Sequence, residues 1–254
     1  MSTILVGVLG SLIAGLATAI GAIPIFFTKN VSHKYLDAML GFAAGVMLAA
    51  TCFSLIIPSI EYGGGGIKGV LITSLGIISG GIMLDLIDKY APHEHLILGD
   101  RKEGPSSSLT KVWLFIIAIT IHNFPEGLAV GVGFGSGNLS DGISLALGIG
   151  LQNMPEGLAV ALALIRENYT SKKSFLIALF TGLVEPIGGI IGASLVQIAK
   201  PILPFVLALA GGAMLFVISD EIIPETHEHG FERIATYGLL IGFIIMMIMD
   251  VTLG

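Results

Sequence analysis

Two copies of one short pattern decide how this chain folds: HNFPEGLAV at residues 122–130 and QNMPEGLAV at residues 152–160. Each copy lies inside a long apolar stretch. Consecutive membrane spans run in opposite directions, so the two copies would meet as an inverted pair at similar depth, which is where transporters commonly bind their substrate. The pattern therefore predicts two carboxylates, Glu126 and Glu156, side by side inside a membrane.

The composition excludes most other classes of protein. The chain has 254 residues, of which 54% are hydrophobic and 12% charged, whereas a soluble domain carries about 25% charged residues. The mean hydropathy is +0.93. A cytosolic enzyme, a secreted domain, a nucleic-acid-binding protein and a disordered chain are excluded, which leaves an integral membrane protein. The single cysteine, Cys52, rules out an intrachain disulfide.

Eight stretches are apolar and long enough to cross a membrane as helices, for which about 20 residues are needed. We therefore predict an all-α, multi-pass membrane protein that forms one transmembrane domain over residues 1–254. The predicted spans are 4–27, 36–60, 67–88, 112–135, 142–165, 174–199, 201–223 and 235–253.

The positions of the basic residues predict the orientation. Ten of the 12 Lys and Arg residues fall in loops on one side, and only Lys68 and Lys200 fall on the other. Cytoplasmic loops carry the excess of Lys and Arg, so both termini are expected outside the cell. The long polar loop 89–111, which contains His93 and His95, is then cytoplasmic.

Several acidic residues lie inside the predicted membrane spans, where a charge is costly. Glu126, Glu156 and Glu185 fall near the middle of the fourth, fifth and sixth spans, and no Lys or Arg lies well inside any span. A single buried acid can be protonated and serve packing only, but ionised carboxylates need a counter-charge. Because the chain supplies no counter-charge there, we expect a cation from outside, either a proton or a metal ion.

The spacing within each copy favours a metal. His122 and Glu126 are four residues apart and share one helix face, as do Gln152 and Glu156. Imidazole nitrogen and carboxylate oxygen suit borderline divalent ions such as Zn²⁺, Fe²⁺ or Mn²⁺. The proline of each copy has no N–H, which frees a backbone carbonyl and is expected to bend the helix.

At these residues the chain resembles the ZIP family of divalent-metal transporters, and most closely its GufA-like bacterial branch. The resemblance covers the eight spans, the termini outside, the long loop after the third span and the paired pattern. It implies a helical bundle in a 3+2+3 arrangement, in which the first three and last three helices form inverted repeats around the fourth and fifth. It also implies movement of metal into the cytoplasm across the cell membrane, inner or plasma.

The resemblance implies a binuclear transport site in which Glu126 and Glu156 bridge two metals. The residues expected around the first metal are His122, Glu126, Gln152 and Glu156, with Met47 nearby. Those expected around the second metal are Asn123, Glu126, Asn153, Glu156 and Glu185. Met47, considered alone, would be core filler.

The resemblance also places an entrance and an exit. The entrance would be formed by Ser54, Glu61 and Asp250. The exit path would run through Asp88, Asp220 and Glu221 to His93 and His95, and a second histidine pair, His227 and His229, follows the seventh span. A solvated polar loop is the plainer interpretation of each histidine pair.

Three residues depart from the family pattern. Many relatives have His where this chain has Gln152 and where it has Asp220, and some have Asp where it has Asn153. An amide is a harder and weaker ligand than imidazole. We therefore expect a broad selectivity, in which Zn²⁺ is carried together with Fe²⁺, Mn²⁺ or Cd²⁺.

Two alternatives from other classes stay open. An intramembrane hydrolase would use a bound metal to activate water, but the pattern is His-x-x-x-Glu rather than the His-Glu-x-x-His of zinc proteases. A proton-conducting channel without metal would leave the histidines without a role. No resident cofactor and no nucleic-acid partner are expected beside the metal and the bilayer, and the oligomeric state stays open, a homodimer included.

Overall fold

The computed structural model describes residues 2–90, 93–94, 102–103, 111–198, 200–227 and 229–253. The described helices with more than three turns are α1 (Thr3–Ala22), α2 (His33–Ala50), α4 (Gly66–Tyr90), α5 (Lys111–Gly135), α6 (Leu139–Arg166), α7 (Ser171–Gly182), α8 (Glu185–Ile198), α9 (Leu203–Val217) and α11 (Glu232–Leu253). The shorter elements are 3₁₀ turns at Ile23–Phe26 and Lys200–Ile202, helices α3 (Ile57–Tyr62) and α10 (Ile223–Thr226), and strands β1 (His93–Glu94) and β2 (Lys102–Glu103).

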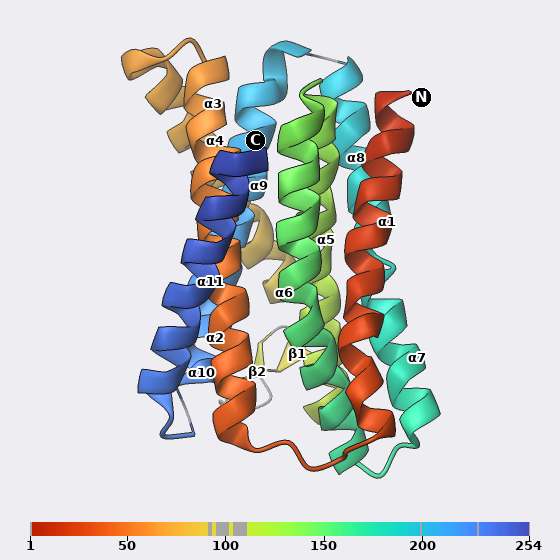
Figure 1. The fold of residues 1–254 in the computed structure, drawn as a ribbon. Coiled ribbons are helices and arrows are strands. Elements are labelled where there is room, and N and C mark those ends of the chain that lie inside the picture. Colours follow the sequence, from red (N-terminus) through yellow and green to blue (C-terminus); the bar gives the residue numbers. More distant parts are fainter. Residues whose placement is uncertain are drawn as a thin grey trace.

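Joined end to end, these elements give eight helical segments in the described residues that are long and apolar enough to cross a membrane, as predicted. Their bounds are Thr3–Phe26, His33–Tyr62, Gly66–Ile87, Val112–Gly135, Leu139–Arg166, Ser171–Ile198, Lys200–Thr226 and Glu232–Leu253. The two ends of the chain lie at the same end of the bundle (Figure 1).

Polar caps begin several of the helices after short loops. The side chains of Ser2, Ser32 and Thr170 each accept a hydrogen bond from the backbone N–H three residues on, and Asn138 accepts one from Ser140. Such caps satisfy N–H groups that the first helical turn leaves without a partner. The starts of α1, α2, α6 and α7 are therefore encoded locally.

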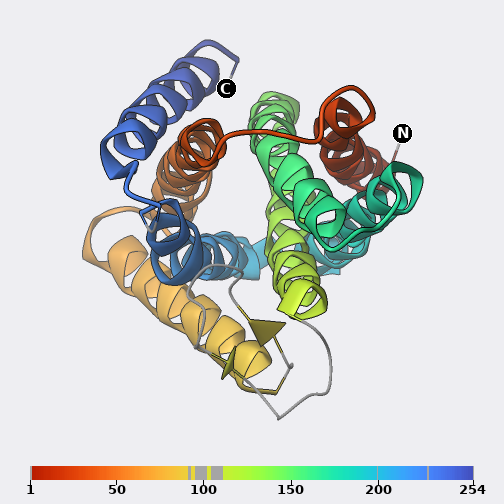
Figure 2. The same ribbon diagram turned by 90° about the horizontal axis from the view of Figure 1, so that it is seen from below.

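Helices distant in sequence pack in pairs. Helix α2 lies along α11, α4 along α9, α5 along α8, and α1 along α6. Viewed along the bundle, α5 and α6 cross its middle, with α2 and α11 on one side and α1 and α7 on the other (Figure 2). The paired pattern thus lies on the two central helices.

Two spans contain matching irregularities. A π-helical segment at Thr51–Ile56 follows α2, and another at Ile218–Ile222 follows α9. Each leads into a short helix that begins with an Ile-Pro pair, at residues 57–58 and 223–224. Single π turns inside helices are frequent at functional sites, and here they fall in the second and seventh spans, which the predicted inverted repeat would relate.

The sixth span is also interrupted. Helix α7 ends at Gly182, and α8 begins at Glu185 after two turn residues. By contrast, Pro125 and Pro155 lie inside the continuous helices α5 and α6. Among the described residues, the break in helical structure next to a candidate ligand therefore occurs at Glu185 and not at the two prolines.

Candidate functional site

The two copies of the pattern face the interior of the bundle. His122 and Glu126 lie on α5, Gln152 and Glu156 lie on α6, and none of the four is more than 4% exposed. These are the side chains expected around the first metal. The structure therefore buries all four on two adjacent central helices, although a buried carboxylate is costly without a compensating partner.

A second group of polar side chains extends the site towards α8. Asn123, Asn153 and Glu185 are each at most 1% exposed. The Asn153 Nδ2 atom donates a hydrogen bond to Glu185 Oε1 at 2.5 Å and another to the Ala14 carbonyl oxygen at 3.0 Å. One amide thus ties α6 to both α8 and α1, and two of the residues expected around the second metal are in direct contact.

The glycine of each copy permits this close packing. A Cβ atom at Gly127 would collide with the backbone of Glu185, and one at Gly157 would collide with the backbone carbonyl of Thr18. Glycine therefore lets α5 approach the start of α8 and lets α6 approach α1, which brings the carboxylates of different helices together. The Pro-Glu-Gly sequence thus places a predicted metal ligand next to a glycine whose missing side chain leaves room for the neighbouring helix.

Many polar atoms in this region are buried without a hydrogen-bond partner of ordinary geometry among the described residues. They are both amide atoms of Asn123 and Gln152, both carboxylate oxygens of Glu126, and one oxygen each of Asn153, Glu156 and Glu185. Buried polar atoms in proteins are nearly always satisfied, so a cluster of exceptions points to an ion or water. All nine atoms belong to predicted metal ligands.

Acidic side chains outnumber basic ones in this buried region. The charge of Glu126 interacts with those of Glu156 and Glu185, so three acids share one desolvated region. Every Lys and Arg side chain that the structure describes is exposed. Within the described residues no Lys or Arg therefore lies inside the bundle, and His122 is one imidazole against several acids, so a bound cation would supply the missing counter-charge.

Glu221, which was expected on the exit path, lies directly beside His122. His122 Nε2 is 2.6 Å from Glu221 Oε1, with both side chains almost fully buried. Glu221 belongs to the π-helical segment between α9 and α10. The irregular turn thus carries an acid from the seventh span to a predicted metal ligand on α5.

A small enclosed cavity adjoins these residues. Its volume is about 20 Å³, and its lining includes His122, Glu156, Ile222 and Glu225. This is room for about one water molecule. Sequence reasoning missed Glu225, although its place four residues after Glu221, at the start of a short helix, was available as a signal.

Met47 is buried at 1% exposure in the apolar core, together with Leu128 and Ala129 of α5. Its surroundings are those of an ordinary core side chain, the interpretation given to Met47 when it is considered alone. Within the described residues, no three His, Cys, Asp or Glu side chains converge tightly enough to form a complete metal cage. The binuclear ligand set therefore stays a prediction.

The expected entrance residues line one cavity. Ser54 Oγ donates a hydrogen bond to Asp250 Oδ1 at 2.6 Å. Both residues, with Glu61, line a cavity of about 290 Å³ at the end of the bundle that holds the two termini. Asn138, which caps α6, and Asp141, in the first turn of α6, also line it, and sequence reasoning missed them because they look like an ordinary helix cap.

The exit path is described only in part. The side chains of Asp88 and His93 and the whole of His95 lie outside the described residues. Asp220 is half-buried, next to Glu221. The structure also shows a cluster that sequence reasoning missed: His229 Nδ1 is 3.0 Å from Oδ1 of the buried Asp37, and the His229 ring lies against that of His33, tilted by 38°. The His-x-x-x-Asp spacing in the second span was the available signal.

A multi-pass helical membrane protein with a buried acidic and imidazole site on two repeated central helices fits the class of membrane metal transporters. Comparison with known families agrees, because residues 93–250 match the model described as ZIP Zinc transporter. The chain belongs to the ZIP family. This membership assigns it to the transporters and not to the hydrolases.

Individual relatives align over nearly the whole chain. "Zinc transporter GufA" from Myxococcus xanthus is 43% identical over 252 residues, which are 98% of this chain and 99% of the relative. "Zinc transporter ZIPB" from Bordetella bronchiseptica is 42% identical over 97% of this chain and 81% of its own length. "Zinc transporter ZIP11" from Homo sapiens is 33% identical over 100% of this chain and 98% of its own length.

Proposed function

We propose that the protein carries Zn²⁺ and related divalent metal ions, including Fe²⁺, Mn²⁺ or Cd²⁺, across the cell membrane into the cytoplasm. The observation that carries this proposal is the group of nine buried polar atoms, on predicted ligands of α5, α6 and α8, that have no hydrogen-bond partner of ordinary geometry among the described residues. Carboxylate, amide and imidazole groups together suit divalent cations. The printed names of the relatives support zinc as the substrate.

The placement of the acidic residues supports a path for the ion. Metal would enter at the cavity of Ser54, Glu61 and Asp250, and would exchange its hydration shell for the ligands of α5 and α6. It would leave past Glu221 and the small cavity beside Glu225. Conduction requires binding that is strong enough for entry and weak enough for release.

Uptake into proteoliposomes tests the proposed site. Wild-type protein should carry Zn²⁺, whereas Glu126→Gln and Glu156→Gln should reduce uptake to the level of empty liposomes, because each removes a bridging charge. Glu167→Gln, which changes an exposed acid after α6, is the matched control and should transport normally. Wild-type rates in both site variants would refute the site.

Cysteine labelling tests the orientation of the protein in the membrane. In a Cys52→Ala background, a cysteine in place of Lys68 should react with a membrane-impermeant thiol reagent in intact cells. A cysteine in place of Ser107, which lies outside the described residues, should react only after the cells are opened. The reverse pattern would overturn the orientation, which follows from the distribution of Lys and Arg.

A further inference from the structure

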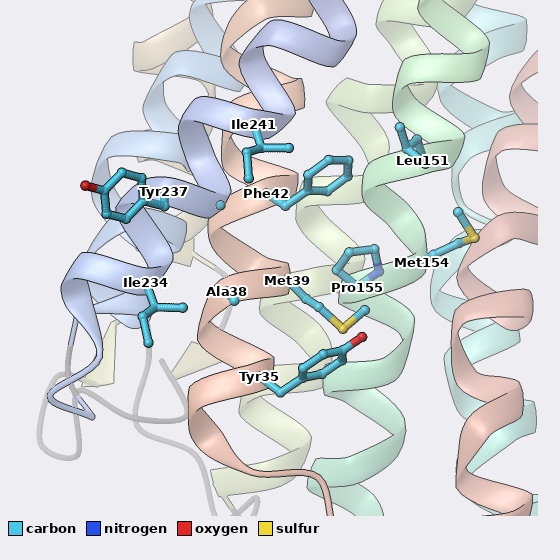
Figure 3. A pocket seen from close by; sticks show the side chains of 11 residues that line it. Tyr35, Ala38, Met39, Phe42, Leu151, Met154, Pro155, Ile234, Tyr237 and Ile241 are labelled. Carbon is cyan, nitrogen blue, oxygen red and sulfur yellow. The ribbon is translucent and has the colours of Figure 1, made fainter.

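A lateral groove lies outside the transport site, between α2, α6 and α11. Its volume is about 510 Å³, in the range of about 300–1,000 Å³ that small-ligand pockets occupy. Tyr35, Met39 and Phe42 of α2 form one wall, and Tyr237 and Ile241 of α11 lie on the same side. Pro155 of α6 faces them across the groove (Figure 3).

The chemistry of the lining selects an apolar occupant. The lining side chains are aliphatic, aromatic or thioether groups, apart from the hydroxyls of Tyr35 and Tyr237. All three helices belong to membrane-spanning segments, so the groove opens towards hydrocarbon. Water in it would find few hydrogen-bond partners, whereas an acyl chain would replace the missing packing contacts.

One end of the groove carries two basic residues, beside one exposed acid, Glu232. Lys34 immediately precedes Tyr35, Arg233 immediately precedes the lining residue Ile234, and both basic side chains are exposed. These residues lie at the first turns of α2 and α11, where the two spans begin. Tyrosine and basic side chains at a span end mark the headgroup level of a bilayer, and this charge complements an anionic phosphate.

We propose that this groove binds one anionic phospholipid, with an acyl chain between α2, α6 and α11 and the phosphate beside Lys34 and Arg233. The chain would pack against Pro155, where the missing N–H leaves the α6 backbone short of one hydrogen bond. Pro155 immediately precedes Glu156. A lipid seated there would support the backbone segment that carries a predicted metal ligand. That last effect rests on the proposed function, whereas lipid binding does not.

Native mass spectrometry of the delipidated protein tests the proposal directly. The protein is titrated with phosphatidylglycerol and, separately, with phosphatidylcholine that has the same acyl chains. We expect one phosphatidylglycerol to bind more tightly than phosphatidylcholine. Lys34→Gln with Arg233→Gln should remove this preference, at about fivefold in affinity for each lost charge. The control, Lys172→Gln with Lys173→Gln, removes two exposed charges at the start of α7 and should preserve the preference.

A second pair of variants tests the groove itself. Ile241→Trp adds bulk to the lining, whereas Ile244→Trp changes an equally exposed residue of α11 outside the lining. Only Ile241→Trp should weaken retention of both lipids. Equal binding of the two lipids to wild type, or equal retention by the two tryptophan variants, would overturn the proposal. So would a wild-type dimer that Ile241→Trp dissociates without any change in bound lipid, because the groove would then hold a second copy of the chain.

The same variants separate this inference from the proposed function. If zinc uptake is absent in every variant and in wild type while phosphatidylglycerol still binds selectively, the transport proposal fails and the lipid site stands. If uptake is normal and lipid binding shows no selectivity, the lipid site fails and the transport proposal stands.

Discussion

His122 on α5 and Glu221 after α9 are joined by a contact of 2.6 Å between Nε2 and Oε1, although 99 residues separate them in the sequence. A contact this short between an imidazole nitrogen and a carboxylate oxygen fixes the orientation of the His122 ring. Metal-bound histidines commonly donate their second N–H to a carboxylate, which holds the ring in place. Glu221 is therefore expected to position His122.

This relationship predicts a loss of metal affinity when the carboxylate is removed. Glu221→Ala should lower the affinity for Zn²⁺ by about 10- to 100-fold, the usual effect of losing such a partner. Glu221→Gln, which keeps an accepting oxygen, should lose less. Equilibrium binding of Zn²⁺ to purified protein measures both variants, with Glu232→Gln, an exposed acid on α11, as the control. A gain in affinity would show that Glu221 competes with the metal for His122.

Metal affinity should depend on pH. Carboxylate and imidazole groups bind metal in their deprotonated forms, so protons and metal compete for the same ligands. The apparent affinity for Zn²⁺ should therefore fall as pH drops from about 7.5 to about 5.5, a range in which an ordinary histidine gains its proton. Binding at several pH values, with buffer effects matched, checks this expectation. A constant affinity across the range would contradict shared ligands.

Selectivity should change at Gln152, whose amide is buried on α6 without a hydrogen-bond partner of ordinary geometry in the described residues. Imidazole favours Zn²⁺, while oxygen ligands suit Mn²⁺ and Fe²⁺ relatively better. Gln152→His should therefore raise the preference for Zn²⁺ over Mn²⁺ in competitive uptake into liposomes. An unchanged order of metals would mean that Gln152 is not a ligand.

The packing of α5 against α8 should not tolerate a larger side chain at Gly127. A Cβ atom there would collide with the backbone of Glu185, so Gly127→Ala should reduce stability by about 1–3 kcal/mol, as overpacking does. At Gly81 of α4 a Cβ atom would meet only Phe216 Cδ2, at 4.0 Å. Gly81→Ala is therefore the control and should leave the melting temperature in detergent unchanged or slightly higher. Equal melting temperatures for the two variants would disprove close packing at Gly127.

The sequence by itself determined the class of protein and the number of spans, and it placed residues 122–130 and 152–160 on two neighbouring spans. These features depend on local properties: a span needs only length and apolarity, and an acid inside it is conspicuous because burying charge is costly. Side chains four apart on one helix share a face whatever surrounds them. The spacing alone therefore pairs His122 with Glu126, and Gln152 with Glu156.

Only the tertiary structure decided how separate helices meet. The contact between His122 and Glu221 depends on the π-helical turn after α9, which rotates that side chain relative to a regular helix. The place of Glu185 at the start of α8, and the cluster of Asp37 with His229, likewise depend on the packing of distant segments. Such contacts join residues of different helices, and helical periodicity predicts only which residues of one helix share a face. How closely the helices approach one another also depends on glycines such as Gly127 and Gly157, and this approach is seen only in the folded protein.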